Sequence, residues 1–152
     1  MRIKMNRTIK FRGKSADNGK WITGYYYHEC GNTYIVEDRQ SLSETSRNVP
    51  YVVIPETVGQ FTGLFDNNGK EIYEGDIVER IVHQNPCFGF IGNVVFDSNI
   101  ALFCVEHNKF GSNSRTPFVM PDDWVDKYSN RLECEFEIKG NIYDHPELIK
   151  KE

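Results

Sequence analysis

The chain has 152 residues, of which 39% are hydrophobic and 26% are charged, and its formal net charge is −4. This composition is typical of a soluble globular protein with one sizeable core or two small ones. No apolar run approaches the ~20 residues that a membrane-spanning helix needs, and the basic N-terminus lacks the apolar core of a secretory signal, so we expect a cytoplasmic protein.

Charge is distributed unevenly along the chain. Residues 1–14 hold six basic residues and no acidic one, which leaves 12 basic against 22 acidic residues in the remainder. The basic residues are Arg2, Lys4, Arg7, Lys10, Arg12 and Lys14. Their spacing suits contacts with phosphates, so nucleic acid is one predicted partner. We favour a half-buried edge strand instead, because residues 9–12 alternate apolar and charged side chains and the acidic remainder repels a duplex.

The first third of the chain predicts aromatic strands. Residues 21–28, WITGYYYH, are aromatic and β-branched, and shorter candidates lie at residues 33–36 and 51–54, on either side of a polar stretch that indicates an exposed loop. In a strand, Tyr25 and Tyr27 face one way, and Tyr26 and His28 face the other. At least one set of tyrosines is therefore expected to stay partly exposed. Such crowding favours first a core, then a protein interface, then stacking on single-stranded bases.

Residues 57–78, TVGQFTGLFDNNGKEIYEGDIV, place turn-forming residues between apolar runs. Residues 66–69, DNNG, predict a tight turn, since their short side chains bond their own backbone and the glycine tolerates positive φ. Residues 74–76 form a second break, after which a strand is expected at residues 77–82. The glycine spacing is not that of a phosphate-binding loop.

The last third predicts a hairpin and one strongly patterned strand. Residues 90–96 and 100–106 flank the turn formers at 97–99, which favours a β-hairpin. Residues 132–139, LECEFEIK, alternate strictly between apolar and charged side chains, as a half-buried strand does. Short helices are expected at residues 121–128 and 145–151, where proline and acidic residues fit a first helical turn.

These elements predict a mainly β fold with few short helices. We expect two small β modules, residues 1–55 with the basic arm and residues 56–152, or alternatively one compact unit overall. The strand order after residue 76 is similar to that of an SH3-like open barrel, an analogy that carries no function.

Four motifs in order along the chain carry a family resemblance. They are IKFRGK at residues 9–14, WxxGY at residues 21–25, the block at residues 57–78 and KGNIYDHPEL at residues 139–148. Together they resemble the YopX family of small bacteriophage and prophage proteins, over about residues 8–148. The resemblance implies no established activity, cofactor or catalytic residue.

Cysteine and histidine spacing gives little support for a metal site. The four cysteines form no CxxC pair, and without a signal peptide we expect reduced thiols. Zinc could accept His28 and Cys30 together with Cys104 and His107, but residues 104 and 107 point to opposite faces of a strand. We therefore expect no metal or other cofactor, with Cys104 and Cys134 as small core residues.

Catalytic patterns are also missing, because no nucleophile stands beside an evident base. Paired acids remain as candidates for metal-dependent hydrolysis. They are Glu71, Glu74, Asp76 and Glu79 in the turn block, and Asp122, Asp123 and Asp126 further on. Acids at turns and at a helix start are the favoured interpretation, so we expect no enzyme.

The sequence thus predicts a non-enzymatic phage or prophage accessory protein that binds a protein partner or copies of itself in the bacterial host cell. Nucleic-acid binding and metal-dependent hydrolysis are the two alternatives. The predicted interaction surface comprises Arg7, Lys10, Arg12, Trp21, Tyr25, Tyr27 and Trp124.

Overall fold

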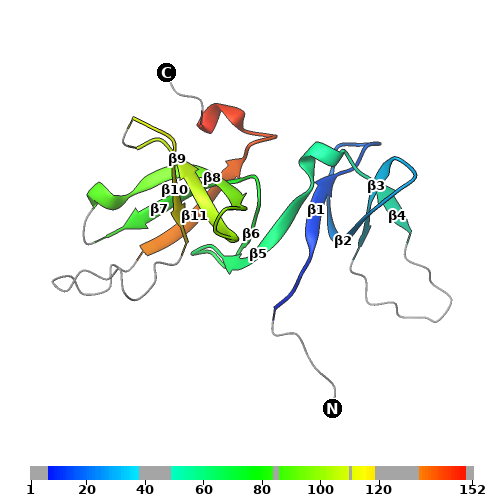
Figure 1. Ribbon diagram of the computed structural model, residues 1–152, viewed down its shortest axis with the longest axis horizontal. Coiled ribbons are helices and arrows are strands. Elements are labelled where there is room, and N and C mark those ends of the chain that lie inside the picture. The colour runs from blue at the N-terminus through cyan, green and yellow to red at the C-terminus, as the bar shows by residue number, and fades with distance from the viewer. Residues whose placement is uncertain (1–6, 38–48, 84–85, 110, 119–133, 150–152) are drawn as a thin grey trace, which may run out of the picture. The chain divides into compact units, whose positions relative to one another are not determined.

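The computed structural model describes residues 7–37, 49–83, 86–109, 111–118 and 134–149. In this part of the chain the fold is mainly antiparallel β, as predicted, with two sheets and short 3-10 turns (Figure 1). The chain divides into two compact units, residues 1–63 and 64–152. The boundary lies inside strand β5 and not at residue 55, because the start of β5 pairs with β1 through Phe11 and Gln60.

The first sheet has the strand order β4-β3-β2-β1-β5-β6. Its strands are β1 (Phe11–Lys14), β2 (Trp21–Glu29), β3 (Asn32–Glu37), β4 (Pro50–Val52), β5 (Gly59–Phe65) and β6 (Glu71–Tyr73). The strands predicted at residues 21–28 and 33–36 are confirmed as β2 and β3. Cys30 and Gly31 join them with φ of 50° and 78°, the positive values that a tight two-residue hairpin turn needs.

Strand β1 corrects one prediction. The pattern of residues 9–12 suggested an edge strand, but β1 lies between two partners, pairing with β2 through Arg12 and Thr23 and with β5 through Arg12 and Gly59. An interior strand allows apolar and charged residues to alternate when its two faces differ in exposure. One face of this sheet packs a small core of Ile22, Ile35 and Val53.

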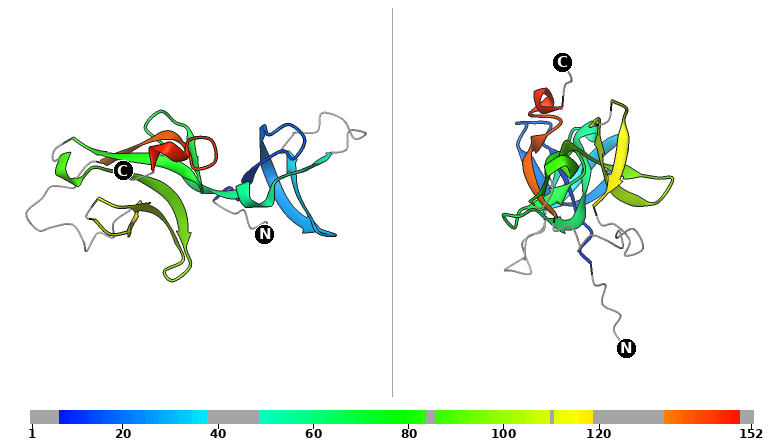
Figure 2. Two further views of the ribbon diagram at one scale, coloured as in Figure 1. Left: turned by 90° about the horizontal axis from the view of Figure 1, so that it is seen from above. Right: turned by 90° about the vertical axis from the view of Figure 1, so that its left-hand side faces the viewer.

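The second sheet has the strand order β10-β9-β8-β7-β11. Its strands are β7 (Asp76–Val82), β8 (Phe90–Asp97), β9 (Leu102–His107), β10 (Ser114–Pro117) and β11 (Cys134–Asn141), and β11 lies alongside β7 (Figure 2). Single 3-10 turns occur at η1 (Pro55–Thr57), η2 (Pro86–Phe88) and η4 (Pro146–Leu148). The SH3-like barrel stays a prediction.

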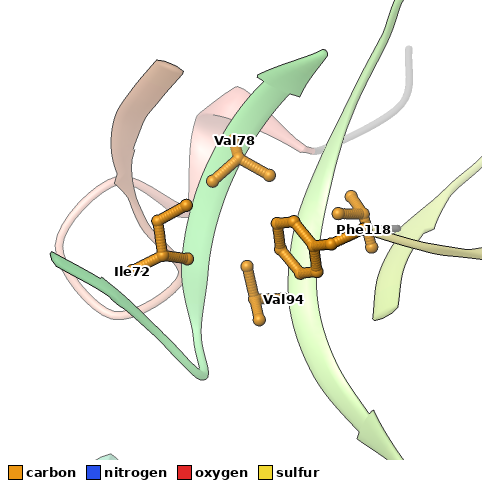
Figure 3. Packing of buried hydrophobic residues seen from close by; sticks show 5 residues of the cluster. Ile72, Val78, Val94 and Phe118 are labelled. Atoms are coloured by element: carbon orange, nitrogen blue, oxygen red, sulfur yellow. The ribbon is translucent and has the colours of Figure 1, made fainter. Parts of the chain in front are cut away.

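The core of the second unit draws its side chains from several strands. Ile72, Val78 and Val94 point toward Phe118 (Figure 3), and all four are buried. Phe136 and Ile138 of β11 pack against this cluster. These two residues share one face of β11, as the alternation of residues 132–139 predicts.

Two connections in the second unit differ in detail from their predictions. The β8–β9 hairpin is confirmed, but its turn extends to Ala101, which has a φ of 53°, so β9 starts at Leu102. The helix expected at residues 145–151 is only the 3-10 turn η4. The helix expected at residues 121–128 lies outside the described residues.

The predicted turn at residues 66–69 is present. It joins β5 to β6 and is hydrogen-bonded to β11. Asp66 O accepts the Gly69 N–H at 3.0 Å, and the Asp66 carboxylate accepts the N–H of Asn68 and of Lys70. Its second oxygen accepts the Ile138 N–H at 3.2 Å. Burial raises the pKa of Asp66, but the three backbone donors outweigh it and hold the pKa below its usual value.

The break at residues 74–76 meets the closing motif of the chain. Asp76, which is 2% exposed, pairs with Asn141 across β7 and β11 and accepts the Tyr73 N–H at 2.8 Å. Ile142 N donates to Gly75 O at 2.9 Å. Residues 57–78 and 139–148 therefore contact each other where β7 begins and β11 ends.

Candidate functional site

The clearest candidate site is one face of the first sheet. Directly paired residues of antiparallel strands share a face, so Arg12 with Thr23 and Lys14 with Trp21 lie on the same side. Alternation along β2 adds Tyr25 and Tyr27, and pairing with β3 and β4 adds further residues, among them Tyr34 and Val52. We call this the aromatic face: Lys10, Arg12, Lys14, Trp21, Thr23, Tyr25, Tyr27, Tyr34 and Val52.

Two tyrosines of the aromatic face are exposed to solvent. Tyr25 is 51% exposed and Tyr27 is 36% exposed. The Tyr27 ring stacks on Tyr34 with centroids 5.0 Å apart and planes 16° apart. Tyr26, which is 44% exposed, points to the opposite face, where its ring lies 5.4 Å from that of Phe11. The tyrosine alternation predicted from the sequence is thus present, with an exposed ring on each side.

Three cations, Lys10 just before β1 and Arg12 and Lys14 within it, lie near aromatic rings. The Arg12 guanidinium is 4.6 Å from the Trp21 ring centroid, and Lys14 Nζ is 5.5 Å from it. Lys10 Nζ is 5.2 Å from the Phe61 ring centroid. Cation–π contacts of this kind place a charge beside an apolar ring surface. Among the paired strand residues that share this face, Glu29 supplies negative charge, at the far end of β2.

The structure brings together most of the residues that the sequence predicted as an interaction surface. Lys10, Arg12, Trp21, Tyr25 and Tyr27 share the aromatic face. Arg7 is exposed and precedes β1, and Trp124 lies outside the described residues. The prediction missed Lys14, Tyr34 and Val52, whose membership depends on strand register and could not be read from alternation in β2 alone.

The second unit carries a groove of about 530 Å³. It is lined by residues 90–93, residues 106–109, Asn113, Leu148 and Ile149. Two of its polar side chains hold neighbouring segments: Glu106 pairs with Arg115 of β10 at 2.9 Å, and Lys109 Nζ donates to the backbone oxygens of Cys87 and Gly89. Nothing in the sequence pattern pointed to this groove, which forms where η4 approaches β8 and β9.

His107 is the buried titratable group beside the groove. Its Nε2 lies 2.8 Å from Thr116 Oγ1, and its ring stacks on Phe90 with centroids 4.0 Å apart. Burial lowers the pKa of His107, and the charges of Lys109 and Arg80 lower it further. A neutral imidazole that donates from Nε2 to Thr116 satisfies this environment. His107 therefore serves packing between β9, β8 and β10.

The sequence of the chain decides its family. A family model described as YopX protein matches residues 10–150. The chain belongs to the YopX family. Among curated proteins, none matches it.

Of the four YopX-like motifs, two lie in the first unit, one spans the boundary between the units and one lies in the second unit. Residues 9–14 and 21–25 supply Lys10, Arg12, Lys14, Trp21 and Tyr25 to the aromatic face. Residues 57–78 and 139–148 supply the turn and strand ends described above. The motifs therefore include residues of the aromatic face as well as residues of the turns that stabilise the second unit.

The acids considered for metal-dependent hydrolysis make contacts that hold the fold. Besides Asp76, Glu71 accepts the Tyr73 hydroxyl at 2.8 Å, and Glu79 pairs with Lys139 at 3.1 Å. Within the described ranges no group of three or more His, Cys, Asp or Glu residues is placed to hold a metal ion. Cys104 is fully buried, as predicted for a small core residue, and burial raises the pKa of its thiol.

The remaining acidic candidates, Asp122, Asp123 and Asp126, lie outside the described residues, as does the side chain of Cys134. A separate finding concerns membranes: the described part of the chain has no helix with the length and apolar character needed to cross one.

Proposed function

We propose that this YopX-family chain is a non-enzymatic phage or prophage accessory protein that acts in the host cytoplasm by binding another macromolecule. The aromatic face carries this proposal. It combines exposed tyrosines with cations on a single sheet surface, and aromatic and arginine side chains are the types enriched in binding interfaces. Several described polar groups of the second unit, by contrast, hold strands and turns.

Rigidity also supports the proposal. A binding surface loses less entropy when its side chains are already ordered before the partner arrives. Tyr27 is ordered by stacking on Tyr34, and Trp21 is ordered by Arg12 and Lys14. Both rings are presented by hydrogen-bonded strands and not by loops. The aromatic face is therefore suited to recognition by a fixed surface.

The test is affinity purification of the tagged protein from phage-infected cells, followed by mass spectrometry and nucleic-acid sequencing. The wild type is expected to retain a macromolecule that is lost when Tyr25 and Tyr27 are both replaced by alanine. Tyr26→Ala is the matched control, since it removes an equally exposed ring from the opposite face. Light scattering of the purified protein detects self-association. An identical set of captured molecules for all variants at high coverage contradicts the proposal.

Metal-dependent hydrolysis is the alternative function, and it would make the protein an enzyme and not a binding protein. Zinc or manganese that survives dialysis, in a ratio near one per chain, would favour it. We place no catalytic role on any described residue.

A further inference from the structure

We propose that the aromatic face binds single-stranded nucleic acid, with phosphates held by the cations of β1 and bases stacked on the tyrosines of β2. This inference rests on the proposed function and names the class of its partner. Three observations on the aromatic face support it: the row of cations, the exposed rings beside this row, and the positive charge of the row, which disfavours pairing with a second copy of the same face.

The cations form a row along one strand. Lys10, Arg12 and Lys14 alternate along the backbone, so they point to one side and follow one another at about 6.7 Å, two residues of strand rise. The ring contacts of Arg12 and Lys14 with Trp21 direct both charges across the same ring. A strand of phosphates is a linear array of negative charge, and a linear array of cations is its electrostatic complement.

The rings lie on the strand next to this row. Arg12 pairs with Thr23, and Tyr25 and Tyr27 continue on the same side of β2. A nucleotide chain that follows β1 with its phosphates thus has exposed ring faces within reach of its bases. Stacking of bases on aromatic side chains combined with a cationic track is the usual design of surfaces that bind single strands with little sequence preference.

Two other partners fit the aromatic face less well: a second copy of the chain and a DNA duplex. In a symmetric dimer formed through this face, the same patch meets itself, which sets the β1 cations of one copy close to those of the other. A DNA duplex hides the faces of its bases in the stack, and the chain's net charge of −4 repels its high charge density. A single strand offers both free base faces and phosphates.

The experiment titrates the full-length protein into fluorescein-labelled oligothymidylate and oligouridylate and follows fluorescence anisotropy. We expect binding that weakens as salt is raised. Tyr25→Ala is expected to weaken binding about ten-fold or more, since each stacked base contributes strongly, whereas Tyr25→Phe retains binding. Tyr26→Ala, on the other face of β2, should bind as the wild type does.

Charge variants test the phosphate contacts separately. Replacing Lys10 and Lys14 by glutamine should lower the slope of log affinity against log salt by about 1.4, because each phosphate contact contributes about 0.7 for a single strand. The matched control replaces Lys70 and Lys139, two lysines of the second unit, and changes the net charge equally. Circular dichroism of every variant verifies that the fold is intact.

Any one of three outcomes overturns the inference. The first is that neither oligonucleotide binds in a salt-dependent way, and the second is that Tyr26→Ala lowers the affinity as much as Tyr25→Ala does. The third is that replacing Lys70 and Lys139 lowers the slope of log affinity against log salt as much as replacing Lys10 and Lys14 does. If oligonucleotides do not bind but a protein captured from cells is lost with Tyr25→Ala, this inference fails and the proposed function stands, with an acidic protein as partner. If neither is seen, both fail.

Discussion

The two units place their distinctive side chains in opposite ways. In the second unit, buried polar residues such as Asp66 and Asp76 accept backbone N–H groups and hold the ends of strands. In the first unit, large aromatic residues such as Tyr25 and Tyr27 lie exposed on a strand whose other side faces a small core. Burying a carboxylate costs free energy that its hydrogen bonds offset, whereas the exposed part of a ring contributes little to the free energy of folding. The first arrangement indicates stability, and the second indicates recognition.

This difference predicts separable effects of substitution. Changes in the turns of the second unit should lower the free energy of unfolding, while changes on the aromatic face should alter binding and leave unfolding almost unchanged. The four substitutions below test the part of this contrast that depends on stability.

The largest effect is expected from Gly92→Ala. A Cβ atom at position 92 would lie 2.1 Å from the backbone oxygen of Glu106 in β9, and a backbone atom cannot move away without breaking the β8–β9 ladder. We expect a loss of roughly 3 kcal/mol or more in the free energy of unfolding. Urea denaturation followed by circular dichroism measures it.

Gly69→Ala provides the contrast for that measurement. Position 69 is open to solvent but has a φ of 78°, so alanine there should cost only about 1–2 kcal/mol of backbone strain. Equal destabilisation by the two substitutions would show that the close approach of β8 and β9 is not what excludes a side chain at position 92.

The second-largest loss in the free energy of unfolding, after that of Gly92→Ala, is expected from Asp66→Ala. The substitution leaves the N–H groups of Asn68, Lys70 and Ile138 without their acceptor, which should cost roughly 2–4 kcal/mol. Because the folded-state pKa of Asp66 lies below its unfolded value of 3.8, this contribution is present above pH 3.8 and is lost as the pH falls below it. The gap between wild type and variant should therefore narrow in acid, as urea midpoints at pH 7 and pH 3 can show. A gap of the same size at both pH values would exclude this role for the carboxylate.

The smallest effect concerns His107 and pH. Its folded-state pKa lies below the ordinary value of 6.5, so the folded protein favours the neutral ring. The unfolded chain then binds the extra proton first, and the free energy of unfolding falls as the pH drops below about 6.5. His107→Gln keeps a donor for Thr116 and removes the titration, so its stability between about pH 7.5 and pH 5 should be flatter than that of the wild type. Parallel curves would contradict this assignment.

Much of the fold follows from local sequence patterns. The turn at residues 66–69 was predictable because Asp and Asn bond their own backbone and Gly69 adopts positive φ without strain. Alternation likewise predicted that Phe136 and Ile138 share a core face. The edge position of β1 was predicted wrongly, because nothing within residues 9–14 reveals how many strands pair with them. Pairing partners are tertiary information.

The candidate site was predictable only in part for the same reason. The sequence places Tyr25 and Tyr27 on one side of a strand, but whether the cations of β1 share that side depends on the register that pairs Arg12 with Thr23. A slip of one residue would put the cations on the opposite face from these tyrosines. We base the proposal of a single-stranded nucleic-acid partner on this register, whereas the sequence alone favoured a protein or a second copy as the partner.

Photo-crosslinking at two positions tests the central claim most directly. A photoreactive residue replaces either Thr23, which is exposed on the aromatic face, or Asn93, which lines the groove of the second unit. Irradiation of living phage-infected cells, followed by purification, records what touches each surface. We predict a crosslinked macromolecule from position 23 and none from position 93. Crosslinks from position 93 alone would contradict the account, because recognition would then belong to the second unit.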